Sequence, residues 1–121
     1  MRKALALLAF VMLTGFGGCA STPTNPQQAV FAAKQSYAVA LTVAVAYKRL
    51  PACAPAAPKV CSDAKVVKQL QAADNAAAAL LDGAEATVRT PGAGLNAATA
   101  VKAAEQAVSA FVTITSALST K

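Results

Sequence analysis

The sequence contains no histidine and no tryptophan, and only 13% of its 121 residues are charged and 5% aromatic. Without histidine, the chain lacks the base of a Ser-His-Asp triad and the commonest metal ligand. The five carboxylates are scattered along the chain, the hydroxyl groups have no imidazole partner, and there is no glycine-rich phosphate-binding loop. We therefore expect a protein that is not an enzyme and that needs no metal or cofactor.

Alanine is abundant, with 33 residues, and 56% of the chain is hydrophobic. This composition is too apolar for a disordered chain. The length fits one small domain. The longest uncharged apolar runs are shorter than the roughly 20 residues of a membrane-spanning helix. We therefore expect one small folded domain.

Residues 1–18 have the layout of a bacterial export signal. Arg2 and Lys3 precede an apolar run of ten residues over 4–13, and glycine-rich sequence leads from there to Cys19. Ten apolar residues are too few for a permanent span but match the core of a removable signal peptide. We therefore expect residues 1–18 to be cleaved off.

The segment Phe16-Gly17-Gly18-Cys19 resembles a lipobox, the recognition site of the lipoprotein signal peptidase. This resemblance to small bacterial lipoprotein precursors implies cleavage between Gly18 and Cys19 and acyl chains, such as palmitate, on Cys19. Ala20 stands where an Asp would favour inner-membrane retention, so the resemblance implies the outer membrane, facing the periplasm. The alternatives are an ordinary secretory signal, cut after Ala20, and a retained anchor.

Residues 19–121 carry nine Lys and Arg against five Asp and Glu, while the whole sequence has a net charge of +6. The cations form no run, and few aromatic side chains are present to stack on bases. Nucleic acid is therefore not an expected partner. The expected partners are the membrane, reached through the lipid, and peptidoglycan or another envelope protein, with self-association as a further option.

Cys53 and Cys61 remain after processing, eight residues apart. An even pair in an oxidising compartment predicts a disulfide, which would stabilise the fold by about 2–3 kcal/mol. A metal site would need more ligands than two thiolates, and a redox pair usually has a CxxC spacing. A structural disulfide is the favoured interpretation.

A polar tether over 19–26 is expected to lead into the first helix, over 27–50. Asn25 is a good N-cap, Pro26 suits the first helical position, and Pro51 ends the helix. Apolar residues lie all round this helix, which predicts burial on more than one side or contact with lipid. One stripe comprises Val30, Tyr37, Leu41 and Val45, and the opposite side carries Val39, Val43 and Leu50.

The second helix is expected over 63–89, with Ser62 as its N-cap. Glu85 and Arg89 form a favourable i,i+4 pair. Apolar residues recur at alternating intervals of three and four, which predicts a heptad-like seam. Its members are Val66, Leu70, Ala73, Ala77, Leu80, Ala84 and Val88.

A Pro- and Gly-containing turn over 90–94 predicts the start of the third helix, over 96–118. Its seam comprises Val101, Ala104, Val108, Phe111, Thr115 and Leu118. Short connections make neighbouring helices antiparallel, so we predict an all-α, up-down-up three-helix bundle over 27–121. Its alanine-rich core is thin, and the seams pack within the chain or, alternatively, form a coiled-coil assembly.

This topology gathers most cations at the end of the bundle that is remote from Cys19. They form a possible basic tip, made of Lys48, Arg49, Lys59, Lys65 and Lys68, with Lys121 nearby. Lys65 and Lys68 lie near a helix N-terminus, where the helix dipole disfavours cations. The alternative is an ordinary solvated helix end.

The expected function is that of a non-catalytic cell-envelope lipoprotein with a structural role or a role in protein or cell-wall interaction. The alternative is a membrane-active protein of the phage lysis or toxin type, in which the apolar segment 37–47 enters lipid. A small-ligand carrier is a weaker alternative, because alanine-packed helices leave little room for a cavity.

Overall fold

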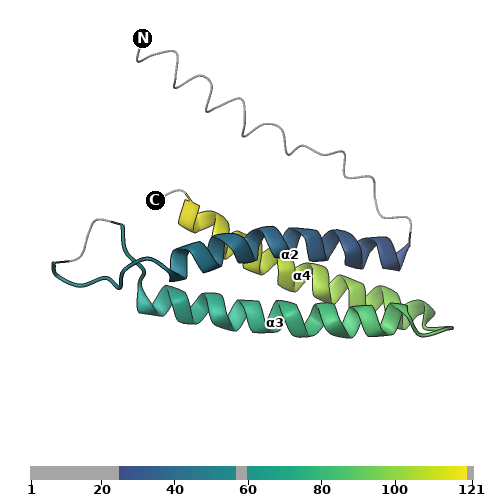
Figure 1. The fold of residues 1–121 in the computed structure, drawn as a ribbon. Helices are drawn as coiled ribbons and strands as arrows, with labels where there is room; N and C mark the ends of the chain where they lie inside the picture. Colours follow the sequence, from purple (N-terminus) through teal and green to yellow (C-terminus); the bar gives the residue numbers. More distant parts are fainter. Residues whose placement is uncertain (1–24, 57–59, 120–121) are drawn as a thin grey trace, which may run out of the picture.

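The computed structural model describes residues 25–56 and 60–119. They form three helices, α2 (Pro26–Lys48), α3 (Ala64–Val88) and α4 (Gly94–Ser119). The predicted all-α, up-down-up bundle is confirmed, since α3 runs against both neighbours (Figure 1). We call the end that contains the start of α2 and the α3–α4 turn the proximal end, and the end that contains the α2–α3 connection the distal end. The starts of α2 and α4, and the turn between α3 and α4, lie at the right of Figure 1.

The start of α2 follows the prediction. The Asn25 side chain accepts a hydrogen bond from the backbone N–H of Gln28 at 2.9 Å, and Pro26 is the first helical residue. The helix ends at Lys48, two residues before the expected end, with Arg49 as its C-cap. Leu50 already lies in the turn, because its N–H bonds to the Tyr47 carbonyl at 3.1 Å.

The predicted N-cap of α3 is wrong by one residue. Asp63 caps the helix, and its carboxylate accepts from the N–H groups of Lys65 at 2.7 Å and Val66 at 3.3 Å. Ser62 is buried instead, and its hydroxyl donates to the Leu50 carbonyl at 3.0 Å. Serine and aspartate are both good N-caps. Because the Ser62 hydroxyl bonds to the Leu50 carbonyl in the preceding loop, Asp63 caps the helix.

The disulfide between Cys53 and Cys61 is present, with Cα atoms 5.0 Å apart. Backbone hydrogen bonds close the neck of the same loop. The Cys53 N–H donates to the Ser62 carbonyl at 3.1 Å, and the Ser62 N–H donates to the Pro51 carbonyl at 2.8 Å. The end of α2 is thereby held beside the start of α3.

The turn between α3 and α4 is where the prediction placed it. Gly92 has a φ of 79°, in the left-handed region that glycine adopts most readily. α4 begins at Gly94, two residues before the expected start at Asn96. The turn thus reverses the chain at the proximal end.

α4 supplies the centre of the core, and its predicted seam is confirmed. Phe111 is fully buried, and its ring lies 5.7 Å from that of Tyr37 on α2. Thr115 is also buried, and its hydroxyl donates to the Val112 carbonyl at 2.9 Å, so it leaves no unsatisfied donor. The remaining seam residues, Val101, Ala104, Val108 and Leu118, are buried or half-buried.

One member of the predicted α3 seam is wrong. Leu81 is only 2% exposed and belongs to the core, whereas Leu80 is 41% exposed. The buried face therefore passes from Ala77 to Leu81 in a step of four, where a strict heptad takes three. Steps of this kind keep the buried face aligned with the 3.6-residue turn of a straight helix.

The inward face of α2 contains Val30, Tyr37 and Leu41 of the predicted stripe, and alanines take most of its other positions. The buried members are Ala29, Val30, Ala33, Ala40 and Ala44, with Tyr37, Leu41 and Tyr47 packed against them. Val45, expected in the stripe, is 39% exposed. Alanine allows closer approach of the helix backbones, so the alanine-rich face of α2 packs inward, and the opposite apolar face of α2 stays exposed.

Candidate functional site

Polar contacts join α2 to α3 along the length of their interface. From the proximal to the distal end, Lys34 forms an ion pair with Glu85, the Tyr37 hydroxyl donates to the Asp74 carboxylate at 2.5 Å, and the Asp63 N–H donates to the Tyr47 hydroxyl at 2.9 Å. The α3 partners stand eleven residues, or about three helical turns, apart and so share one side of the helix. These contacts fix the position of α3 along α2.

Two of these contacts shift a pKa. Burial, followed by the hydrogen bond to Asp74 and the negative charges of Asp74 and Asp82, raises the pKa of Tyr37 to about 12. The hydrogen bond from Lys34 and the positive charges of Arg89 and Lys34 lower the pKa of Glu85. Tyr37 is therefore a neutral hydrogen-bond donor and Glu85 a carboxylate at neutral pH.

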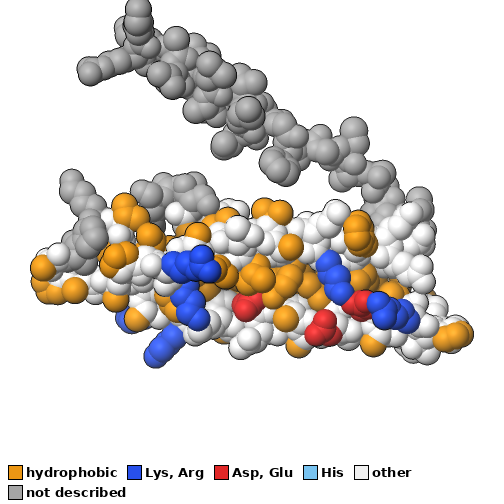
Figure 2. Space-filling model, in the orientation of Figure 1, with side chains coloured by type: hydrophobic (Ala, Val, Ile, Leu, Met, Phe, Trp, Pro, Cys, Tyr) orange, Lys and Arg blue, Asp and Glu red, His pale blue; other side chains and the backbone are white. Residues whose placement is uncertain are grey.

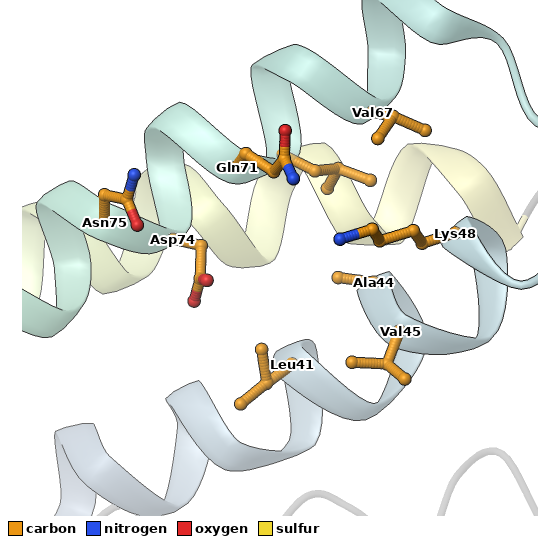
Figure 3. Close-up of a pocket in the computed structure, with 9 residues that line it drawn as sticks. Leu41, Ala44, Val45, Lys48, Val67, Gln71, Asp74 and Asn75 are labelled. Carbon is orange, nitrogen blue, oxygen red and sulfur yellow. The ribbon is translucent and has the colours of Figure 1, made fainter.

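A groove of about 410 Å³ lies between α2 and α3 toward the distal end. Its apolar lining comprises Leu41, Ala44, Val45, Val67 and Leu70, and its polar lining comprises Lys48, Gln71, Asp74 and Asn75. Figure 3 shows Lys48 extending from the end of α2 toward α3, where Gln71, Asp74 and Asn75 follow one another along the facing side. The groove thus offers one cation, one carboxylate and two amide groups above an apolar floor.

The distal end carries cations that lack acidic partners. Lys48 and Arg49 close α2, and Lys65 and Lys68 lie in the first turns of α3. We call these four residues the distal basic surface. Within the described part of the chain none of them makes an ion pair, whereas Lys34 and Arg89 at the proximal end both pair with Glu85.

Figure 2 shows this arrangement on one face of the molecule. One group of Lys and Arg side chains lies toward the left, over the end of α2 and the start of α3. A second group lies on the right, beside acidic side chains, and both hydrophobic and acidic side chains lie between the two groups. Five cations among the described residues make no ion pair: Lys48, Arg49, Lys65 and Lys68 lie at the distal end, and Lys102 lies on α4.

The structure brings together the predicted tip residues Lys48, Arg49, Lys65 and Lys68 at one end of the bundle. Lys59 and Lys121 lie outside the described residues, as do the signal segment 1–18 and Cys19. Within residues 25–56 and 60–119, no three His, Cys, Asp or Glu side chains gather as a metal site.

The sequence analysis identified the Glu85–Arg89 pair, which the structure confirms, but missed the contacts between α2 and α3. The signal was available in the acidic residues themselves. Asp74 and Glu85 stand eleven residues apart, which places both acids on one side of a straight helix. Their partners on α2 are aromatic and basic residues inside an apolar helix, which a hydrophobic pattern does not distinguish from core residues.

Comparison with known proteins gives no relative from which a function could be transferred, since no family model, curated protein or solved structure matches this chain. The site is therefore interpreted from its own chemistry.

Proposed function

We propose that this chain is a non-catalytic cell-envelope lipoprotein that contacts an anionic partner, such as the carboxylates of peptidoglycan, through its distal end. The observation that supports the proposal is the distribution of charge. At the proximal end Lys34 and Arg89 share Glu85 as their ion-pair partner, whereas the four residues of the distal basic surface make no ion pair within the described chain. An acyl chain on Cys19 would hold the proximal end at the membrane and point the distal end away from it.

The groove fits this proposal. Lys48 belongs both to the distal basic surface and to the lining of the groove, beside the amide side chains of Gln71 and Asn75. A peptide that carries a carboxylate and small apolar side chains would find the Lys48 cation, hydrogen-bonding amides and an apolar floor in one place, provided that its carboxylate lies at the Lys48 end, away from Asp74. A branched anionic polymer such as peptidoglycan presents such peptides.

Retention on isolated cell walls tests the proposal, with the full chain purified from membranes in detergent. Lys68→Glu and Lys102→Glu are matched variants, because both residues are exposed on helices and each substitution changes the charge equally. One Lys near an anionic surface contributes about 1 kcal/mol, so we expect Lys68→Glu to weaken retention roughly fivefold or more and Lys102→Glu to leave it unchanged.

The double variant Lys65→Glu/Lys68→Glu should lose most of the retention, and the binding of the unmodified chain should weaken as salt is added. Folding is protected in these variants, because acidic residues in the first turns of α3 complement the helix dipole. Equal retention of the double variant and the unmodified chain would refute the proposed role of the distal basic surface.

One observation favours a second candidate, a membrane-active protein of the lysis or toxin type. Over Pro26–Lys48, α2 is long and apolar enough to cross a membrane by length and composition, although 28% of the residues in its most apolar window are buried inside the bundle. Release of α2 would break its contacts with Asp74 and Glu85 and expose its alanine face. Leakage of dye from lipid vesicles would favour this candidate, and an inert folded bundle would exclude it.

A further inference from the structure

The groove between α2 and α3 has opposite charges at its two ends. Lys48, the last residue of α2, lines its distal end, whereas Asp74 lines the other end, where the Tyr37 hydroxyl donates to it. Tyr37 precedes Lys48 by eleven residues, which is about three helical turns along α2. Within the described part of the chain, Lys48 and Asp74 make no ion pair with each other or with a third residue. The groove therefore has a cationic end and an anionic end.

The polar groups of the groove keep unused hydrogen-bonding capacity. The Asp74 carboxylate accepts one hydrogen bond, from the Tyr37 hydroxyl to Oδ1, and no second group of the described residues donates to it. The side chains of Lys48, Gln71 and Asn75 are exposed, and none of them makes a hydrogen bond within residues 25–56 and 60–119. Because an amide both donates and accepts, Gln71 and Asn75 can bond to the N–H and C=O groups of a peptide unit.

The length of the groove determines the size of its occupant. α3 lines it with one face from Val67 to Asn75, which is about two helical turns or roughly 12 Å. A single amino acid carries its ammonium and its carboxylate on one carbon atom and cannot reach both ends. An extended chain advances about 3.3–3.6 Å per residue, so about three residues span the groove. Ala44 and Leu70 are buried beneath it, and this apolar floor suits small side chains.

We propose that this groove binds a short peptide of about three residues, with a free ammonium group at Asp74 and a free carboxylate at Lys48. The charges of such a peptide complement those of the groove at both ends, and its peptide units meet Gln71 and Asn75 along the groove. Figure 3 shows these side chains following one another along α3, with Lys48 reaching toward α3 from the end of α2. The reverse direction would place like charges together at both ends, so the groove orients its ligand.

This inference rests on the proposed function for the origin of the ligand. A cell wall presents peptides, but an amide cross-link between two of them consumes the amine of one and a carboxylate of the other. Each peptide of a linked pair therefore lacks one charge that the groove would bind. We expect the groove to prefer wall peptides that are not cross-linked, whereas the distal basic surface attracts any anionic polymer.

Titration of the full chain, purified from membranes in detergent, with tri-alanine tests the proposal. Nuclear magnetic resonance follows the side-chain amide signals of Gln71 and Asn75, which should shift as the groove fills. We expect N-terminal acetylation and C-terminal amidation of the tripeptide each to weaken binding at least about threefold, because each removes one charge. Equal affinity for tri-alanine and both blocked forms overturns the proposal, as does the absence of any shift at millimolar peptide.

Two variants that each remove one charge test the direction of the ligand. Asp74→Asn keeps an acceptor for the Tyr37 hydroxyl, which protects the fold, and it should bind the free and the acetylated peptide equally. Lys48→Gln should bind the free and the amidated peptide equally. Asp82→Asn is the matched control, because Asp82 is exposed on α3 outside the groove, and it should keep both preferences. If Asp74→Asn instead loses the preference against amidation, the assigned direction is overturned.

Failure of this proposal is distinguishable from failure of the proposed function. Lys68→Gln removes a cation of the distal basic surface that does not line the groove, so it should weaken retention on cell walls and leave tri-alanine binding unchanged. A chain that is retained on cell walls but does not bind tri-alanine would refute the ligand alone. A chain that binds tri-alanine in the assigned direction but is not retained on cell walls would support the ligand and refute the proposed function.

Discussion

Tyr37 performs two tasks at one position in the bundle. Its ring packs against Phe111, and its hydroxyl donates to Asp74 across the interface between α2 and α3. Burial and the nearby carboxylates favour the neutral phenol, which is why the pKa of Tyr37 rises from 10 to about 12. The stability that this residue provides should therefore be fully present below pH 10 and be lost as the pH rises from 10 to about 12.

The variant Tyr37→Phe tests this assignment. We expect it to be less stable than the unmodified chain by about 1 kcal/mol at pH 8, since one hydrogen bond is lost. The difference in stability should shrink as the pH rises from 10 to 12, because Tyr37 then ionises and no longer donates its hydrogen bond, which the variant lacks at every pH. Urea unfolding at pH 8 and pH 11 measures it, and a difference that stays constant would contradict the assignment.

At the scale of the element, the sequence predicts the three helices and their order, and their observed ends lie within two residues of the predicted ones. Capping residues, prolines and glycines mark those ends, and these signals are local. The errors occur where neighbouring residues compete for one place. Ser62 and Asp63 are both good caps, and Leu80 and Leu81 are both apolar, so only the packing of the whole bundle decides between them.

α2 shows the same limit in another form. A helix that is apolar on all sides does not reveal every buried position: Val30, Tyr37 and Leu41 of the predicted stripe belong to the core, whereas Val45 does not and alanines complete the inward face. The contacts of Lys34 and Tyr37 with α3 were also missed, because each partner pair is more than thirty residues apart in the sequence. The distal cations were predicted to lie together because the topology alone determines their place.

The two adjacent leucines of α3 make a matched test of the observed register. Leu81→Ala should destabilise the bundle by about 2–5 kcal/mol, because it removes a buried side chain and leaves a cavity. Leu80→Ala should change the stability by less than about 0.5 kcal/mol, since Leu80 lies at the surface. Circular dichroism during urea unfolding would show the difference, and the reverse order would support the strict heptad.

At the scale of the whole molecule, the two ends of the bundle differ in their ion pairing and in their loops. The proximal end carries the start of α2 and the two cations that share Glu85, and the distal end carries the disulfide loop and the four cations of the distal basic surface. The loop is closed by a disulfide and by hydrogen bonds of Cys53 and Ser62. These links hold the end of α2 beside the start of α3, although the core of the bundle is rich in alanine.

The intact mass of the full chain, recovered from membranes under non-reducing conditions, tests the proposed lipid on Cys19 and the disulfide together. We expect a chain that begins at Cys19, carries added acyl mass and is two hydrogens lighter than its reduced form. A lipid-free chain beginning at Ser21 would instead indicate an ordinary secreted bundle. The proposed orientation of the distal end away from a membrane would then be refuted.

The uneven pairing of cations along the bundle would also affect how the molecule meets the proposed anionic partner. A rod of roughly 35 Å with unbalanced positive charge at one end has a permanent electrostatic asymmetry along its axis. Near a polyanion, and within a Debye length of about 8 Å at physiological ionic strength, that asymmetry turns the charged end forward before any contact forms. The distal cations would thus accelerate productive encounters, so their removal would slow association more than it would hasten dissociation.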